Sequence, residues 1–263
     1  IVLVPLDGSA FAEQALPFAL AVARQADARL QLVRVQPSFP IDVVDSDARR
    51  YLTRLAAELD SQLPGRVDHQ VLVDEFGPLE HAPPASNALA DVLHRHASNI
   101  QPLLMVLATH GFGGVRRAWL GSVADALIRV APCPVLLVRP QDEAFGIAAA
   151  ADRGIRHVLI PLAGSEAAER VIPFALELGT PFGARYTALR VVSPLSWDVS
   201  PHSYDPYPAY ASPLSREAAR RPLERSAAQV HATGAACAIE IIDGVSAAAS
   251  ILEYAHAHAV DVI

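Results

Sequence analysis

The stretch VLVPLDGSAFAEQALPFAL, residues 2–20, recurs without a gap as VLIPLAGSEAAERVIPFAL, residues 158–176. The correspondence continues downstream, where ARLQLVRV (28–35) aligns with ARYTALRV (184–191). Since the register is kept from one expected element into the next, the repeat is larger than a single helix. The sequence therefore predicts a duplicated domain.

A stretch between the copies, QDEAFGIAAAADRG (141–154), combines charges, alanine and glycine without a strand pattern. Such a composition is typical of a linker. We therefore expect a first domain over 1–140 and a second over 155–263. The second copy finishes with AVDVI (259–263), which resembles the start of a fourth strand, so we expect its C-terminal part to be missing from this chain.

Each copy begins with a β-branched run, a Gly-Ser pair and an amphipathic helical pattern. Apolar residues of this helix follow i, i+3, i+4 spacing: Ala12, Ala15, Leu16, Ala19, Leu20 and Ala23, and in the second copy Ala168, Val171, Ile172, Ala175 and Leu176. Further strands of the first copy are expected over 30–35, 67–73, 103–109 and 134–138, and helices near 47–62, 87–97 and 122–130. This alternation predicts an α/β fold of two tandem Rossmann-like domains, each with a mainly parallel sheet flanked by helices.

The last of these strands, PVLLV (134–138), is apolar at every position, which predicts a buried strand or one paired across an interface. Because the second copy keeps the same apolar stripes, we expect the two halves to pack as an intramolecular pseudo-dimer. A homodimer of whole chains is a further assembly that the sequence leaves open.

Charge and residue usage exclude several classes of protein. A net charge of −7 disfavours nucleic-acid binding. All 21 basic residues are arginine, and a chain without lysine cannot form a Walker A loop, a pyridoxal phosphate Schiff base or a protein-kinase site. No apolar run approaches the roughly 18 residues of a membrane span, so we expect a cytoplasmic protein outside the membrane. The two cysteines, Cys133 and Cys237, do not have CxxC spacing, so we expect reduced thiols and no metal site.

A cluster of glycines in ATHGFGGVRRAWLGS (108–122) follows the fourth expected strand. Ligands of doubly wound sheets bind beyond the carboxyl ends of the strands, where the strand order reverses. Both VPLDGS (4–9) and this cluster leave strands at such an edge, and Gly121-Ser122 begins a helix whose free N–H groups favour anions. The cluster therefore predicts a phosphate cradle. The alternative is ordinary turns, with Ser122 and Asp125 forming a capping box.

Taken together, VPLDGS, ATHG, nine residues, GS and APCPVLLV resemble the universal stress protein family, whose loop pattern is Gly-x2-Gly-x9-Gly-Ser/Thr. The resemblance covers the whole first half and most of the second, and it implies a tandem protein of adenine nucleotide α-hydrolase-like fold. ATP-binding members hold adenine near an aspartate after the first strand and the phosphates in this loop. Ala108 departs from the pattern, because its methyl group narrows the approach where the first glycine is expected.

Carried onto this sequence, the resemblance implies that Pro5, Leu6 and Asp7 flank the adenosine, with the Asp7 carboxylate accepting hydrogen bonds from base or sugar, and that Val35 packs on the base. The residues implied at the phosphates are Ala108, Thr109, His110, Gly111, Phe112, Gly113, Gly114, Gly121, Ser122, Val123 and Ala124. The implied ligand is ATP or a related adenine nucleotide, with or without Mg²⁺. Asp7 has an alternative interpretation as a turn or helix-cap residue, and Arg116 and Arg117 are either phosphate contacts or ordinary surface arginines.

The second copy differs at the informative position, where Ala163 replaces Asp7 while Gly164 and Ser165 persist. A hydrogen bond lost from a ligand usually costs about 1–3 kcal/mol. We therefore expect nucleotide in the first half only, with the second half as its partner domain.

No nucleophile, base and orienting residue can be recognised together, and GxSxG does not occur. The sequence favours a nucleotide-binding regulatory protein of the stress response, without catalytic residues and at most slow in ATP hydrolysis. Two alternatives stay open: a dimerisation or partner-binding module that binds no nucleotide, and an ATP-using enzyme of the wider adenine-binding α/β group.

Overall fold

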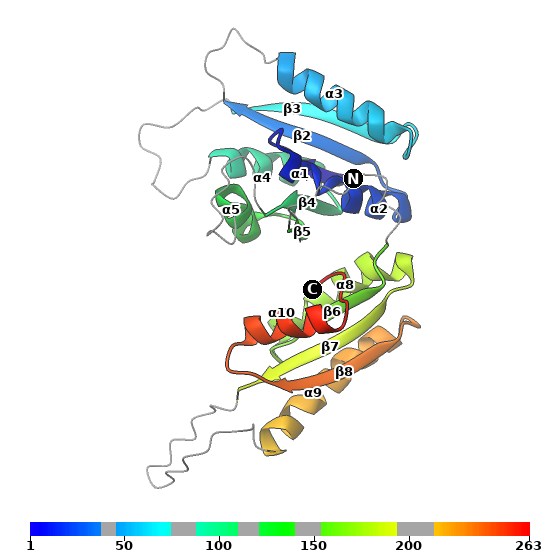
Figure 1. Cartoon of the computed structure of the whole chain (residues 1–263), viewed down its shortest axis with the longest axis vertical. Coiled ribbons are helices and arrows are strands. Elements are labelled where there is room, and N and C mark those ends of the chain that lie inside the picture. Colours follow the sequence, from blue (N-terminus) through cyan, green and yellow to red (C-terminus); the bar gives the residue numbers. More distant parts are fainter. Residues whose placement is uncertain (38–45, 75–87, 110–120, 140–153, 194–212) are drawn as a thin grey trace. The chain divides into compact units, whose positions relative to one another are not determined.

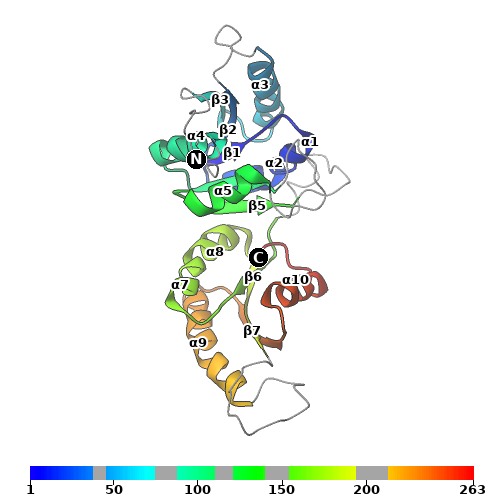
Figure 2. The same ribbon diagram turned by 90° about the vertical axis from the view of Figure 1, so that its left-hand side faces the viewer.

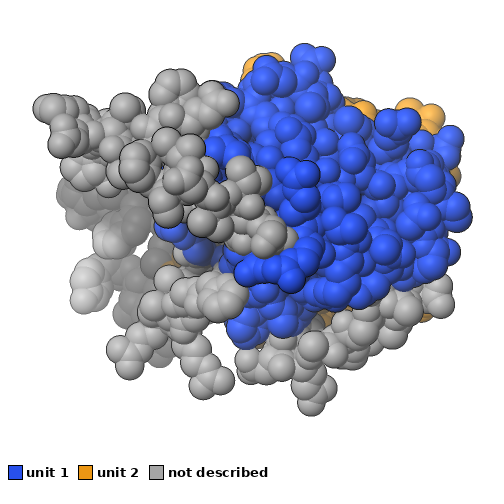
Figure 3. Space-filling view, turned by 90° about the horizontal axis from the view of Figure 1, so that it is seen from above, with its two compact units in different colours: residues 1–154 blue, residues 155–263 orange. Residues whose placement is uncertain are grey.

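The computed structural model describes residues 1–37, 46–74, 88–109, 121–139, 154–193 and 213–263. The chain divides into two compact units, Ile1–Gly154 and Ile155–Ile263, which Figure 3 colours blue and orange. Each unit is an α/β layered body and is described by itself.

The sheet of the first unit has five parallel strands in the order β3-β2-β1-β4-β5 (Figure 1). Their bounds are β1 Val2–Pro5, β2 Leu30–Pro37, β3 Val67–Asp74, β4 Leu104–Ala108 and β5 Val135–Val138. Val2 pairs with Leu30 on one side and with Leu104 on the other. The strand order therefore reverses at β1, as in a doubly wound sheet.

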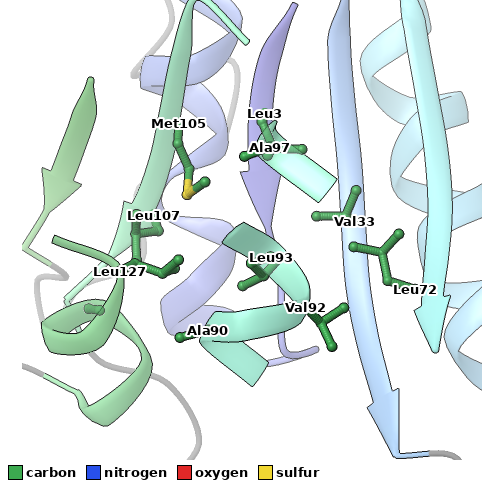
Figure 4. Close-up of a cluster of buried hydrophobic side chains, with 11 residues drawn as sticks. Leu3, Val33, Leu72, Ala90, Val92, Leu93, Ala97, Met105, Leu107 and Leu127 are labelled. Atoms are coloured by element: carbon green, nitrogen blue, oxygen red, sulfur yellow. The ribbon is translucent and has the colours of Figure 1, made fainter. Parts of the chain in front are cut away.

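Helices cover both faces of this sheet. They are α1 Ala10–Glu13, α2 Leu16–Gln25, α3 Ser46–Asp60, α4 Ala88–Ile100 and α5 Ser122–Val130. On the face of α4 and α5, the strand residues Leu3, Val33 and Met105 pack against Leu93 and Leu127 (Figure 4). Neighbouring strand residues point to the opposite face and are buried there under α2 and α3.

The first amphipathic stretch forms two helices instead of the single helix that its apolar spacing predicts. Pro17 follows the break between α1 and α2; it has no N–H to donate, and its ring would clash with the carbonyl of Glu13 in a continuous helix. Pro173 has the same place after the break between α7 (Glu166–Glu169) and α8 (Val171–Gly179). The apolar stripe nevertheless holds in the first unit, where all six of its residues are buried.

The second unit contains a three-stranded parallel sheet in the order β6-β7-β8. Its elements are β6 His157–Pro161, α7, α8, a short 3-10 helix over Thr180–Phe182, β7 Arg185–Val192, α9 Pro213–His231, β8 Cys237–Asp243 and α10 Ala247–Ala257. Figure 2 shows α8 and α9 on one face and α10 on the other. Val158 forms a parallel bridge with Val262, at the place where Val2 pairs with Leu104 in the first unit. Val262 therefore lies where the sequence predicts a fourth strand, although residues 259–263 contribute only this single bridge.

Two expectations about burial need correction. Val171 is 45% exposed, although the repeat places it on the buried stripe at the position of Ala15. Val171 is exposed because its helix has no full strand in the place of β4 among the described residues. In the first unit α1 and α2 contact β4, whereas the described part of the second unit has only the Val262 bridge at the corresponding place. The apolar strand β5 lies at the edge of its sheet, and only Val138 of its four residues is buried, so the prediction of a buried strand is wrong. The other predicted possibility, pairing across an interface, stays a prediction.

Candidate functional site

The candidate site lies at the carboxyl ends of β1 and β4, on either side of the point where the strand order reverses. The two strands are paired through Val2 with Leu104 and Leu3 with Met105, and both run in the same direction. Residues that follow β1 therefore share one edge of the sheet with residues that follow β4. In a sheet of this topology, that edge is where ligands bind.

After β1, the chain makes a tight turn held by Asp7. The Leu6 N–H donates to the Val33 carbonyl (2.8 Å), and the Asp7 Oδ1 accepts the Ser9 N–H (2.9 Å). Gly8, between them, has a φ of +91°, a conformation that favours glycine. Asp7 is thus a turn residue, as one interpretation of LDGS predicts, while Ser9 caps α1 by accepting the Ala12 N–H (3.1 Å).

The Asp7 carboxylate is a candidate ligand-binding group, because both of its oxygens are hydrogen-bond acceptors. Asp7 and Pro5 are half-buried. The Leu6 side chain is only 5% exposed and belongs to the core, so Leu6 can offer a ligand little besides its backbone. Val35, near the end of β2, packs at the margin of the core cluster under α4 and α5.

After β4, backbone hydrogen bonds bring together two segments that are separate in the sequence. The Thr109 N–H donates to the Val138 carbonyl (2.9 Å), and the Thr109 carbonyl accepts the Gly121 N–H (2.6 Å). Thr109 is 8% exposed, so it supports the site from inside. Ala108, the last residue of β4, is half-buried.

The helix α5 begins at this hydrogen bond, with Gly121 as its N-cap and Ser122 as its first residue. Ser122 is therefore not the capping residue, and the capping box predicted as an alternative does not form: the Asp125 side chain pairs with Arg129 (3.1 Å). Within the described residues no side chain caps α5, whereas serines cap α1, α7 and α10. The first N–H groups of a helix carry partial positive charge and attract anions.

Around that helix start, Ser122 is exposed, Val123 is half-buried and Ala124 is buried, at 3% exposed. Ser122 is therefore the side chain best placed to meet a ligand, and Ala124 offers its backbone. The other residues predicted at the phosphates lie outside the described residues: His110, Gly111, Phe112, Gly113, Gly114, and with them Arg116 and Arg117.

The second unit repeats the turn without its carboxylate. The Leu162 N–H donates to the Leu189 carbonyl (2.8 Å), Gly164 has a φ of +78°, and Ser165 caps α7 by accepting the Ala168 N–H (3.3 Å). Ala163 stands exposed where the first unit has Asp7. The turn therefore forms in both units, with or without the acidic side chain.

Two residues beside the Asp7 turn are missing from the sequence prediction. The Arg34 guanidinium lies against Gly8 and over the ring of Tyr51, with 5.6 Å between Cζ and the ring centroid. Burial, followed by the carboxylates of Glu13 and Asp7, raises the pKa of the Tyr51 phenol. The sequence repeat could have pointed to Arg34, since Arg190 occupies the corresponding position in ARYTALRV.

The chain belongs to the universal stress protein family, whose model matches residues 1–139 and again 154–263. A putative universal stress protein of Staphylococcus aureus strain USA300 is 31% identical over 144 residues, which cover 54% of this chain and 84% of that protein. The crystal structure of a putative universal stress protein from Pseudomonas aeruginosa matches 98% of this chain and 79% of its own, with 16% identity and a TM-score of 0.62. That likeness supports the tandem fold.

A universal stress protein solved in complex with cAMP matches 53% of this chain and 96% of its own, with 21% identity and a TM-score of 0.39.

The described residues contain neither a membrane-spanning helix nor a cluster of metal-binding side chains. No helix there is long and apolar enough to cross a membrane. No group of three or more histidine, cysteine, aspartate or glutamate side chains in those same residues is arranged to hold a metal ion.

Proposed function

We propose that the first unit binds ATP or a related adenine nucleotide and that the chain acts as a nucleotide-binding regulatory protein of the stress response. The observation that carries the proposal is the pairing of two features at one edge of the sheet. A carboxylate on a fixed turn follows β1, and a helix start that no side chain of the described residues caps follows β4. One acceptor of hydrogen bonds and one anion-binding end suit a ligand with a polar sugar and phosphates.

The adenosine end is assigned to the β1 side. The Asp7 carboxylate, which also accepts the Ser9 N–H, is assigned as the hydrogen-bond acceptor for the base or ribose. Pro5, Leu6 and Val35 supply backbone and apolar contacts around the base. Because Ala163 removes the carboxylate in the second unit, we assign the nucleotide to the first unit alone.

The phosphate end is assigned to the start of α5, where Ser122, Val123 and Ala124 present their N–H groups. In the family pattern the glycine loop, residues 110–114 of this sequence, also belongs to the phosphate end; these residues lie outside the described part of the chain. A magnesium ion, if it accompanies the nucleotide, would be held mainly by phosphate oxygens and water, as is usual for Mg²⁺, and the exposed Ser122 hydroxyl could supply a protein oxygen.

A second candidate function is a dimerisation or partner-binding module. The observation in its favour is β5, an edge strand of four apolar residues of which three are only half-buried. A strand edge of this kind favours pairing with another strand. We propose on this ground that the two units pack as an intramolecular pseudo-dimer. Light scattering tests whether whole chains also form homodimers.

Freshly purified protein tests the nucleotide proposal directly. The protein is denatured and the released small molecules are identified by mass spectrometry, and the emptied protein is then titrated with ATP, ADP and adenosine by calorimetry. We expect a released adenine nucleotide, or binding of ATP to the emptied protein. Absence of both would overturn the proposal and favour the partner-binding module, while rapid turnover of ATP would favour an enzyme.

A further inference from the structure

We propose that Arg34 is a positioning residue: its guanidinium, held between Gly8 and the ring of Tyr51, fixes the Asp7 turn in the conformation that receives the adenosine. This inference rests on the proposed function, because it names a residue that acts on the ligand only through Asp7. The sequence resemblance assigns no role to Arg34.

The first observation is the closeness of the guanidinium to the turn. A Cβ atom built on Gly8 would lie 3.3 Å from both Cζ and Nη1 of Arg34. The positive φ of residue 8 favours glycine, and a Cβ there would in addition require the Arg34 guanidinium to move by a few tenths of an ångström. The guanidinium lies against Gly8, the residue that follows Asp7 in the turn. A shift of the turn toward this side would therefore displace Arg34.

The second observation is that Arg34 is itself held from the other side. Its Cζ lies 5.6 Å from the ring centroid of Tyr51, within the range of a cation–π interaction. Arg54 approaches the same ring at 5.7 Å and pairs with Glu13 (3.8 Å). An arginine packed between a backbone turn and an aromatic ring loses most of its conformational freedom. It therefore keeps the turn and the ring at a fixed separation.

The third observation is that an arginine also lies against the turn glycine in the second unit. There Arg190 Nη1 would lie 2.7 Å from a Cβ on Gly164 and donates to the Leu162 carbonyl (3.3 Å). The residue before this glycine is Ala163, so the arginine does not depend on a carboxylate for its place. Its common role in both units is to hold the turn.

The effect on binding follows from preorganisation. If Arg34 is removed, the Asp7 turn samples more conformations, and binding must order it again. Ordering a mobile segment of this size weakens binding by roughly three- to tenfold. The loss should be the same for adenosine and ATP, because both use the Asp7 end.

The test compares Arg34→Ala with the matched variant Arg190→Ala in calorimetric titrations of adenosine and ATP. We expect Arg34→Ala to bind both ligands about three- to tenfold more weakly, and Arg190→Ala to bind them like the unmodified protein. Asp7→Ala should cost less affinity in the Arg34→Ala background than alone, since the two residues act together. Additive losses, or unchanged affinity in Arg34→Ala, would overturn the proposal.

A ligand-free measurement separates this inference from the proposed function. Amide hydrogen exchange of Ser9, followed by NMR, reports the hydrogen bond from its N–H to Asp7 and should accelerate in Arg34→Ala. If the unmodified protein releases no adenine nucleotide and binds no ATP once emptied, the proposed function fails; unchanged exchange at Ser9 refutes the positioning role in either case.

A second pair of variants covers the outcome in which Arg34→Ala does not fold. Tyr51→Phe keeps the ring under the guanidinium and should preserve both adenosine affinity and Ser9 exchange. Tyr51→Leu removes the ring and should weaken binding in the direction of Arg34→Ala. Equal behaviour of these two variants would contradict the stacked arrangement.

Discussion

The backbone N–H of Gly121 donates a 2.6 Å hydrogen bond to the carbonyl of Thr109, whose own N–H is bound to Val138 in β5. The chain thus returns to the end of β4 before it enters α5, and the start of that helix is attached to the sheet. This attachment makes Gly121 a joint between the strand edge and the proposed phosphate end.

Replacement of Gly121 by valine should weaken ATP binding far more than adenosine binding. The backbone at Gly121, with φ −66° and ψ 152°, is open to any residue, so the expected damage comes from the branched side chain beside the phosphates. Calorimetry with both ligands measures the difference. Equal losses would mean that the base and phosphate ends are assigned to the wrong sides.

Asp7→Ala should weaken ATP and adenosine together, by roughly 1–3 kcal/mol, because both ligands lose one acceptor. The variant also loses the hydrogen bond to the Ser9 N–H, yet the second unit forms the same turn around Ala163. Circular dichroism should therefore show an intact fold. Unchanged affinity for both ligands would move the adenosine end away from β1.

Nucleotide should bind with a stoichiometry of one per chain. The second unit lacks the carboxylate at Ala163, so a ligand there would have no partner for its polar sugar or base from this turn. Calorimetric titration of emptied protein gives the number directly. Two equivalent sites per chain would contradict the assignment to the first unit.

Gly8→Ala should destabilise the protein more than Gly65→Ala does. Both glycines have positive φ, +91° and +66°, but only Gly8 has Arg34 in the place of a new Cβ, while nothing lies within 4 Å of Gly65. The backbone strain is about 1–3 kcal/mol in each case, and the contact with Arg34 adds to it in Gly8→Ala. Urea unfolding of both variants gives the difference, and equal losses would show that the arginine yields freely.

Acid should destabilise the second unit through His157. Burial lowers the pKa of this histidine, whose Nε2 lies 2.8 Å from the Thr187 hydroxyl. Below the unfolded pKa of about 6.5, the unfolded chain binds a proton that the folded unit resists, so stability falls as the pH drops through that value. Urea unfolding between pH 7.5 and pH 5.5 measures the slope.

The residue at the corresponding position of the first copy supplies the variant for this test. His157→Ile, which copies Ile1, should reduce stability at pH 7.5 and also flatten the dependence on pH. Thr187→Val keeps the histidine and should keep the slope. An unchanged slope in His157→Ile would assign the acid sensitivity to other groups, among them His96, whose pKa is also lowered by burial.

The sequence predicts the sheet well because apolar runs and repeated spacing report burial directly. Every expected strand of the first copy is found, and α5 has the predicted bounds of 122–130. The break before Pro17 escapes a periodicity argument, since the apolar stripe passes through it unchanged. A proline four residues after an expected helical carbonyl is the feature that locates it.

The candidate site is less predictable than the sheet, because its parts act through backbone groups and through neighbours distant in the sequence. Ser122 fits a capping pattern by its spacing, and only the geometry at Gly121 shows that the helix starts one residue earlier than that pattern requires. Arg34 belongs to an ordinary strand sequence, and its contact with Gly8 depends on the pairing of β1 with β2.

The matching turns at Gly8 and Gly164 give the molecule an internal reference of its own. Two copies of the same turn lie on one polypeptide, so they are always present at equal concentration and in the same solvent. A property measured at one turn, such as its exchange rate or its tolerance of a substitution, has its comparator in the same sample. Differences between Asp7 and Ala163 can therefore be attributed to the side chain, without the uncertainty that enters when homologous proteins from different organisms are compared.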